Sequence, residues 1–211
     1  MRPVVARRYN RRRVRHVTAK LGGFLWRPLT ASDADTAFVV RLRNDPRFAR
    51  WFYRRQVTPA LHRKFVAAAD ERGEINWVVE RDDDHKEPVG VAAIYNIDEK
   101  NRKAECGRTI FLEPRAFHLN WVISAHVVFE RLGLNKAYIE TLADNRIIAR
   151  GVARLGMTAE ALLRQHVVDD NGRPRDVLLY TILAAEWRAL RAATSERWGT
   201  PEFLDESEAT A

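Results

Sequence analysis

The sequence predicts an α/β (α+β) protein in which helices cover both faces of a mixed, mostly antiparallel sheet. The apolar patterns follow the order strand, helix, helix, three strands, helix, strand, helix and two further strands. Consecutive strands joined by short turns pair antiparallel, whereas a helix between two strands lies on a face of the sheet. The length of 211 residues suits one domain, with or without tails.

One strand and two helices are predicted at the start of this pattern. The apolar segment 24–29 is the strand, and the segment from Thr30 to Asp33 offers an N-cap to the first helix. The Asn-Asp-Pro sequence at 44–46 ends that helix, because the residue before a proline disfavours helical angles. Thr58 and Pro59 begin the second helix, which ends at Gly73.

Strands dominate the middle of the chain, and helices alternate with strands after it. Polar turns separate three predicted strands at 75–81, 89–98 and 103–112. The later elements are a helix at 115–131, a strand at 136–142, a helix at 145–156 and a strand at 176–183. Residues 157–168 fit either a helix or a strand, and Asn171-Gly172 marks a turn.

The positive charge is confined to the amino-terminal segment. Residues 1–20 carry eight of the 36 basic residues and no acid, so the remaining 28 basic residues balance all 28 acids. The segment fits a solvated tail, an arm that binds RNA phosphates, or an Arg-rich transit peptide. We therefore expect a basic, flexible arm at 1–22, a folded domain at 23–185, and a helix with a polar tail at 186–211.

The remaining composition argues against several classes of protein. The single cysteine, Cys106, excludes an internal disulfide framework and favours a reducing, cytoplasmic location. No apolar run approaches the roughly 18 residues of a membrane helix, and no secretory signal is evident. The histidines are scattered and no Cys or His stands at ligand spacing to another, so we predict no metal site.

Three segments, in this order and spacing, resemble the GNAT acyltransferase superfamily. They are "LRNDPRFARWFYRR…TPALHRKFV" at 42–66, "AECGRTI" at 104–110 and "IETLADNRIIARGVARLGM" at 139–157. The chain looks most like the ribosomal-protein alanine and aminosugar (pseudaminic acid pathway) N-acetyltransferases. This resemblance spans residues 24–183 and implies a central sheet of about seven strands.

The resemblance implies acetyl-CoA as the acyl donor, but the coenzyme loop is altered. In the family pattern an arginine or glutamine precedes two small residues, and here His118 and Asn120 stand at the small positions. A helix amino end attracts a diphosphate without glycine, which only permits a closer approach. The implied coenzyme-binding residues are Ile110, Phe111, Leu112, Arg115, Ala116, Phe117, His118, Leu119, Asn120 and Asn145.

The resemblance also implies a catalytic base and marks a missing acid. Glu105 matches the family glutamate and is the candidate base, although a solvent-facing strand residue fits equally well. Backbone N–H groups at 110–112 would stabilise the oxyanion of the tetrahedral intermediate. Many relatives have a tyrosine acid where this chain has Val152, and Tyr95 and Tyr138 are the possible substitutes.

The segment after the first helix is the expected acceptor site. Aromatic and basic side chains are mixed there, which suits the binding of a nucleotide-linked aminosugar and equally suits the binding of RNA. The same pattern also fits aromatic side chains packed in the core beside arginines exposed to solvent. The candidate residues are Arg43, Asn44, Trp51, Tyr53 and Arg54.

The leading hypothesis is acetyl transfer to a primary amine of a small molecule. The alternatives are a ribosomal-protein N-terminus as acceptor, an aminoacyl-tRNA or other non-CoA donor that engages the basic arm, and a GNAT-like module without activity. A homodimer is also expected, because dimers are common among such proteins.

Overall fold

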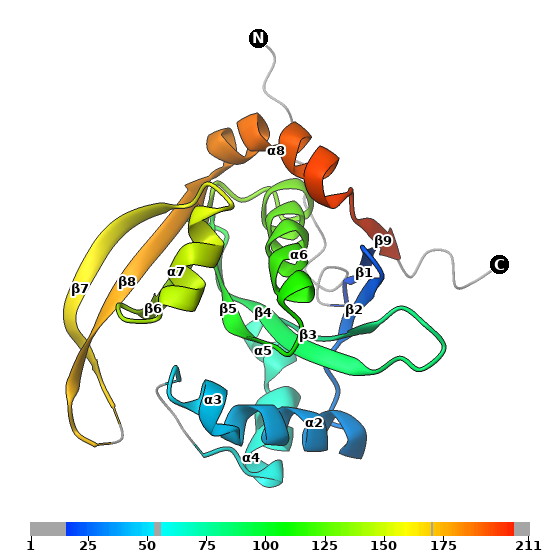
Figure 1. Cartoon of the computed structure of the whole chain (residues 1–211), viewed down its shortest axis with the longest axis vertical. Coiled ribbons are helices and arrows are strands. Elements are labelled where there is room, and N and C mark those ends of the chain that lie inside the picture. The colour runs from blue at the N-terminus through cyan, green and yellow to red at the C-terminus, as the bar shows by residue number, and fades with distance from the viewer. Residues whose placement is uncertain (1–15, 53–55, 170, 205–211) are drawn as a thin grey trace.

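The computed structural model describes residues 16–52, 56–169 and 171–204. Within these ranges a sheet of nine strands runs in the order β7-β8-β6-β5-β4-β3-β2-β1-β9 (Figure 1). The strands are β1 (Thr18–Leu21), β2 (Phe24–Pro28), β3 (Ile75–Arg81), β4 (Pro88–Asp98), β5 (Lys103–Phe111), β6 (Lys136–Leu142), β7 (Thr158–Val168), β8 (Pro174–Leu183) and β9 (Glu202–Leu204). Only β5 and β6 pair in parallel, so the predicted mixed, mostly antiparallel sheet is confirmed.

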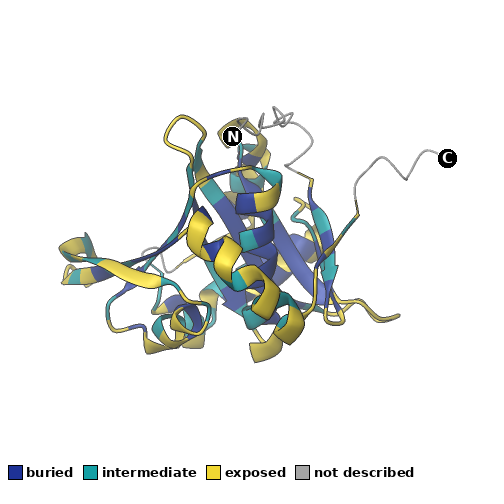
Figure 2. Ribbon diagram, turned by 90° about the horizontal axis from the view of Figure 1, so that it is seen from above, coloured by how far each residue is buried: buried dark blue, intermediate teal, exposed yellow. Residues whose placement is uncertain are grey.

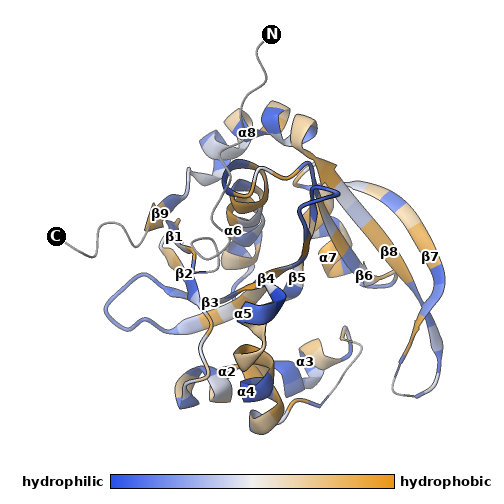
Figure 3. Cartoon of the chain, turned by 180° about the vertical axis from the view of Figure 1, so that it is seen from behind, coloured by the Kyte–Doolittle hydropathy of each residue, from blue (hydrophilic) through white to orange (hydrophobic). Residues whose placement is uncertain are grey.

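Helices lie on both faces of this sheet, as predicted. They are α2 (Asp33–Asn44), α3 (Pro46–Ala49), α4 (Pro59–Ala67), α5 (Ala69–Arg72), α6 (Pro114–Ala125), η1 (His126–Arg131), α7 (Arg146–Ala153) and α8 (Ala184–Trp198). The larger core joins α6 to one face of β3 through Trp77 and Val79, whereas α2 packs on the opposite face through Val78. Buried residues gather in the sheet and in the helix that crosses it (Figure 2). The short helices α2, α3 and α4 group at the end of the molecule away from α8 (Figures 1 and 3).

The predicted helix boundaries rest on local capping. Ser32 accepts a hydrogen bond from the backbone N–H of Asp35 at the start of α2. Thr58 does the same for Leu61 N–H, with proline at the first position of α4. Gly73 ends α5 in the left-handed conformation with a φ of 70°.

The structure shortens the expected basic arm and adds strands at one edge of the sheet. Residues 18–21 were expected in the basic arm but form β1, because Val17, Ala19 and Leu21 alternate into the core. Residues 1–15 of the arm lie outside the described part of the chain. At the carboxyl end β9 pairs with β1, so the sheet exceeds the expected size of about seven strands at this edge. The ambiguous segment 157–168 is the edge strand β7.

The central pair of strands diverges after a short parallel ladder. β5 and β6 pair only from Lys103 with Lys136 to Glu105 with Tyr138, and both strands continue beyond that point without pairing to each other. On the other side of β5, Ala93 pairs with Gly107 and Val91 with Ile110. Two residues of β5 therefore lie opposite one residue of β4, and this bulge bends β5 away from β6.

Candidate active site

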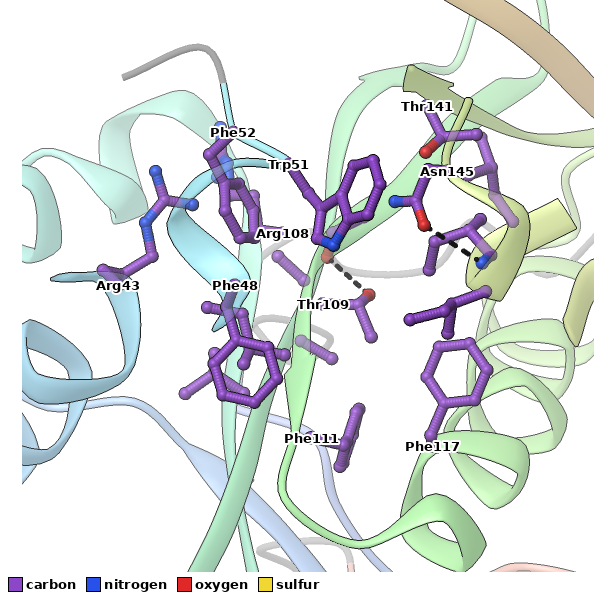
Figure 4. A pocket seen from close by; sticks show the side chains of 18 of the residues that line it. Arg43, Phe48, Trp51, Phe52, Arg108, Thr109, Phe111, Phe117, Thr141 and Asn145 are labelled. Carbon is purple, nitrogen blue, oxygen red and sulfur yellow. Dashed lines mark hydrogen bonds between the residues drawn. The ribbon is translucent and has the colours of Figure 1, made fainter. Parts of the chain in front are cut away.

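A cleft of about 1070 Å³ opens where β5 and β6 diverge. The aromatic side chains of Phe48, Trp51 and Phe52 stand on one side of it, and Phe111 and Phe117 face them (Figure 4). Thr141 and Asn145 from β6 and the start of α7 complete the opposite wall (Figure 4). The bulge and the strand divergence thus create a cavity between the two helical layers.

Glu105 lies in this cleft with only 7% of its surface exposed. Its carboxylate accepts a hydrogen bond of 2.6 Å from the Tyr95 hydroxyl and one of 2.8 Å from the Asn96 amide. Burial raises the pKa of Glu105; these two hydrogen bonds lower it, and the nearby charge of Glu140 raises it again, with a net increase. A buried carboxyl with a raised pKa is suited to accept a proton near neutral pH.

Tyr95 is held as a donor to that carboxylate. Burial and then the charge of Glu105 raise the pKa of Tyr95 well above its usual range. The absence of a side chain at Gly107 makes room for it, since a Cβ there would lie 2.8 Å from the Tyr95 hydroxyl. Tyr138, the other possible acid, has its pKa raised to about 12, first by burial and then by Glu105. Both phenols therefore resist ionisation.

Arg108, which the sequence analysis did not single out, also lines the cleft. Its guanidinium lies 3.9 Å from the centre of the Tyr95 ring and donates to Glu74 at 2.7 Å. Burial opposes ionisation of Glu74, but hydrogen bonds from Arg72 and Arg108 outweigh it and lower the pKa of Glu74 to about 2. Arg108 occupies a left-handed conformation, with a φ of 51°, inside the bulge. A bulge of this kind cannot be located from residue types alone.

The amino end of α6 lies beside the cleft and lacks a side-chain cap. Glu113, at the N-cap position, accepts a hydrogen bond from Arg81 at 2.8 Å instead of from the helix backbone. Pro114 has no N–H, so the amides of Arg115 and Ala116 are the first-turn donors without an intrahelical partner. Such an end attracts anions.

The predicted loop residues separate into two groups. Phe117 and His118 line the cleft, whereas Arg115 is exposed outside it. Ala116, Leu119 and Asn120 are core residues, so only their backbone atoms could meet a ligand.

Asn120 and His118, which replace small residues in the loop, each contact a tryptophan side chain. The Asn120 side chain accepts a hydrogen bond of 3.0 Å from the Trp26 indole, which satisfies both buried groups. The His118 ring stacks on Trp198 of α8, with ring centres 5.7 Å apart. Burial, and then the charges of Arg154 and Arg197, lower the pKa of His118. His118 therefore lies at the rim of the cleft as a neutral ring.

The other predicted coenzyme residues lie on both walls. Ile110, Phe111 and Leu112 line the cleft on the β5 side. The backbone N–H of Leu112 already donates to the Val89 carbonyl at 2.8 Å, so it is not available as an oxyanion donor. Asn145 caps α7 by accepting from the Ile148 N–H at 3.4 Å and lines the cleft.

Val152 has no exposed surface and packs in the main core. Its neighbour Gly151 lines the cleft instead, directly against the ring of Phe117. Position 152, where the family resemblance implied a tyrosine acid, therefore offers no proton donor.

The structure places only some of the predicted acceptor residues in the cleft. Arg43 and Trp51 line the cleft, and the Arg43 guanidinium lies 3.7 Å from the centre of the Phe52 ring. Asn44 is outside the lining and joins the loop ends by two hydrogen bonds with the backbone of Val57. Tyr53 and Arg54 fall outside the described residues.

Several other cleft residues were missed by the sequence analysis. Besides Arg108, they include Phe48, His62, Phe65, Asn76, Glu140 and Thr141. Glu140 and Thr141 lie within the segment 139–157 used for the family resemblance, which was the available signal. Nothing in the sequence distinguishes His62, on α4, from a core histidine.

The described residues contain neither a cluster suited to a metal ion nor a helix suited to a membrane. No three His, Cys, Asp or Glu side chains there are grouped to hold a metal ion. No helix in the same ranges has the length and apolar character to cross a membrane.

Comparison with known proteins places this fold and cleft in one family. Residues 24–158 match the model of the acetyltransferase (GNAT) domain. The uncharacterized N-acetyltransferase YoaA of Bacillus subtilis (strain 168) is 34% identical over 122 residues, covering 56% of this chain and 68% of YoaA.

Solved structures share the same fold at low sequence identity. A GCN5-related N-acetyltransferase from Brucella melitensis has a TM-score of 0.72 and 22% identity, covering 86% of this chain and 85% of that one. The spermidine N-acetyltransferase from Vibrio cholerae, solved with CoA and spermine, has a TM-score of 0.69 and 19% identity, covering 79% and 98%. A ribosomal-protein alanine acetyltransferase from Vibrio fischeri has a TM-score of 0.68 and 18% identity, covering 81% and 98%.

The fold and the family match define an acyltransferase that acts on amino groups. The chain belongs to the GNAT acetyltransferase family and is an N-acetyltransferase.

Proposed function

We propose that this N-acetyltransferase moves an acetyl group from acetyl-CoA to a primary amine of a small molecule, such as an aminosugar nucleotide. The observation that carries the proposal is the buried Glu105 carboxylate in the cleft between the diverging strands. Acetyl-CoA, when bound, supplies a thioester whose carbonyl carbon an amine can attack. The chain binds and orients both partners and takes a proton from the amine. The new C–N bond replaces the C–S bond, and the coenzyme leaves as its thiolate.

The residues around the cleft fit the coenzyme. Beyond Glu105 and Tyr138, β5 and β6 no longer pair with each other, and the space between them suits the extended arm of the coenzyme. The uncapped amides of α6 suit its diphosphate. Ile110, Phe111, Phe117, His118 and Asn145 line this part of the cleft. The replacement of glycine at His118 and Asn120 is compatible with binding, because Asn120 faces the core and the His118 ring stacks on α8.

Glu105 would take the proton that the attacking nitrogen loses. Tyr95 and Asn96 orient the carboxylate by donating one hydrogen bond to each oxygen. Backbone N–H groups at Ile110 or Phe111 are the candidates for stabilising the negative charge that develops on the carbonyl oxygen. Tyr95 acts as a positioning residue in this scheme, because its hydroxyl proton is already committed to Glu105.

The acceptor would lie against the aromatic and basic wall. Trp51 offers a stacking surface for a base or sugar, and Arg43 and Arg50 supply positive charge beside it. Stacking plus a guanidinium suits a nucleotide-linked sugar, whose diphosphate is anionic. Tyr53 and Arg54 remain candidates from sequence.

The test is a binding and turnover assay on the full chain. Calorimetry with acetyl-CoA should detect binding, and thiol release should depend on an amine drawn from a panel of aminosugar nucleotides, ribosomal-protein N-terminal peptides and polyamines. The expected outcome is turnover with an aminosugar nucleotide that falls at least about 100-fold in Glu105→Gln. Absence of binding at millimolar coenzyme would refute the donor assignment.

The other hypotheses concern the basic segment, the assembly and the location. If an aminoacyl-tRNA is the donor, removal of residues 1–15 should abolish activity together with salt-sensitive RNA binding; with acetyl-CoA as donor it should change little. A homodimer is tested by sedimentation. The buried free thiol of Cys106 fits a reducing compartment, and we propose a cytoplasmic location.

A further inference from the structure

Three helices bring a basic and aromatic group together beside the cleft, and two of its members, His118 and Arg154, line it. His118 of α6 stacks on Trp198 of α8 with an angle of 25° between the rings. The guanidinium of Arg197 lies 4.9 Å from the centre of the Trp198 ring. Arg154, at the end of α7, lines the cleft together with His118. We call these four residues the α8 corner.

The α8 corner combines two positive charges, those of Arg154 and Arg197. Neither Arg154 nor Arg197 forms a salt bridge with an acidic residue of the described chain. Both are close enough to His118 for their charges to add to the effect of burial in lowering its pKa. Two guanidinium groups near one neutral ring repel each other unless an anion lies between them. A phosphate, which accepts several charge-assisted hydrogen bonds, would relieve that repulsion.

The position of the α8 corner also favours a particular ligand. The uncapped amides at the start of α6 form one anion-attracting point, and His118 lies about one helical turn farther along the same helix. Coenzyme A carries two separate phosphate groups, a diphosphate and a monoester on the ribose. One coenzyme molecule can therefore place a phosphate at the start of α6 and another at the α8 corner, whereas a single free phosphate can occupy only one of these positions.

Helix α8 lies beyond residues 24–158, the part of the chain that matches the family model. We propose that this carboxyl-terminal helix completes the coenzyme site, with Arg154 and Arg197 binding the ribose phosphate and the His118–Trp198 stack lying beside the adenosine. The inference rests on the proposed function, because it takes acetyl-CoA to be the donor.

The test compares CoA with dephospho-CoA, which differs only in that phosphate. Calorimetry on the full chain should show dephospho-CoA binding at least about tenfold more weakly, the loss expected for a charge-assisted contact. Arg197→Gln should weaken the binding of CoA by a similar factor and leave the binding of dephospho-CoA nearly unchanged. Arg188→Gln is the matched control, since it removes the same charge from an exposed position about two and a half turns earlier on α8.

Each outcome decides the inference. Equal affinities for CoA and dephospho-CoA would refute the proposed role of the α8 corner in phosphate binding, while leaving the assignment of acetyl-CoA as donor intact. An equal loss in Arg197→Gln and Arg188→Gln would also overturn it, because it would indicate a general effect of charge. A chain that binds neither coenzyme refutes the proposed donor and this inference with it. Thermal unfolding of both variants checks that α8 stays folded.

Discussion

The hydroxyl of Tyr95 donates a 2.6 Å hydrogen bond to the carboxylate of Glu105, its register partner on the neighbouring strand. The contact joins the two side chains that the sequence had suggested separately as base and acid. It makes the phenol a support for the carboxylate, and the carboxylate the group that exchanges a proton with the acceptor.

Replacing Glu105 by Gln should lower kcat by at least about 100-fold. Only the ionised carboxylate can accept a proton, so activity of the native enzyme should rise as pH increases through the raised pKa of Glu105. The acid limb of kcat/KM should therefore lie above the ordinary value of 4.5 and disappear in the variant. Glu87→Gln, at an exposed turn, is the control. An unchanged acid limb in Glu105→Gln would assign the base elsewhere.

Replacing Tyr95 by Phe should move the acid limb to higher pH. The hydrogen bond from Tyr95 favours the charged carboxylate, so its loss raises the pKa of Glu105 further. The rate at high pH should fall much less than in Glu105→Gln, because the base is still present. A pH–rate profile that loses amplitude at every pH without shifting would instead assign Tyr95 a direct role in proton transfer.

Glu74 should make the stability of the protein sensitive to acid. Its pKa in the folded state is about 2, below the ordinary value of 4.5, so its contribution is complete above pH 4.5 and is lost as pH falls toward 2. The shift corresponds to about 3 kcal/mol of unfolding free energy. Urea unfolding of Glu74→Gln should show a loss of this order at pH 7 and a smaller dependence on acid. Identical pH dependence in both proteins would contradict the paired state of Glu74.

The effect of Gly151→Ala on the free energy of unfolding should depend on the side chain at position 117. A Cβ at Gly151 would lie 2.6 Å from the edge of the Phe117 ring, so Gly151→Ala should destabilise the native protein. In a Phe117→Ala background the clash is absent, and alanine in α7 should stabilise by up to about 1 kcal/mol. A change of sign in the unfolding free energy is the expected result. Equal effects in the two backgrounds would show that the ring moves aside freely.

Much of the fold was predictable because local signals and tertiary packing agree. The Ser32 cap, the Pro59 start and the alternation in β3 each specify an element that the fold retains. β1 was missed because it is short and follows a run of arginines whose charge obscures the alternation of Val17, Ala19 and Leu21. β9 was missed because a strand of three residues has no recognisable period.

The site was less predictable, because its geometry depends on long-range contacts. Glu105 and Arg43 were found from their motifs, and both line the cleft. Asn44 matched its motif equally well, and Asn120 was assigned from its place in the coenzyme loop, yet their side chains bond to Val57 and Trp26. A one-dimensional pattern gives no information on which neighbour a polar side chain will bond. Arg108 was missed for the same reason, since its place in the cleft depends on the β5 bulge and on Glu74.

The pairing of β9 with β1 sets Thr18 opposite Leu204 at the edge of the sheet farthest from β7. The first and last segments of the folded domain are thus adjacent, and four places in the strand order separate β1 from the cleft strand β5. A short peptide could join Leu204 to Thr18 and let the chain open instead at the exposed turn between β3 and β4, giving a circularly permuted enzyme with an undisturbed cleft.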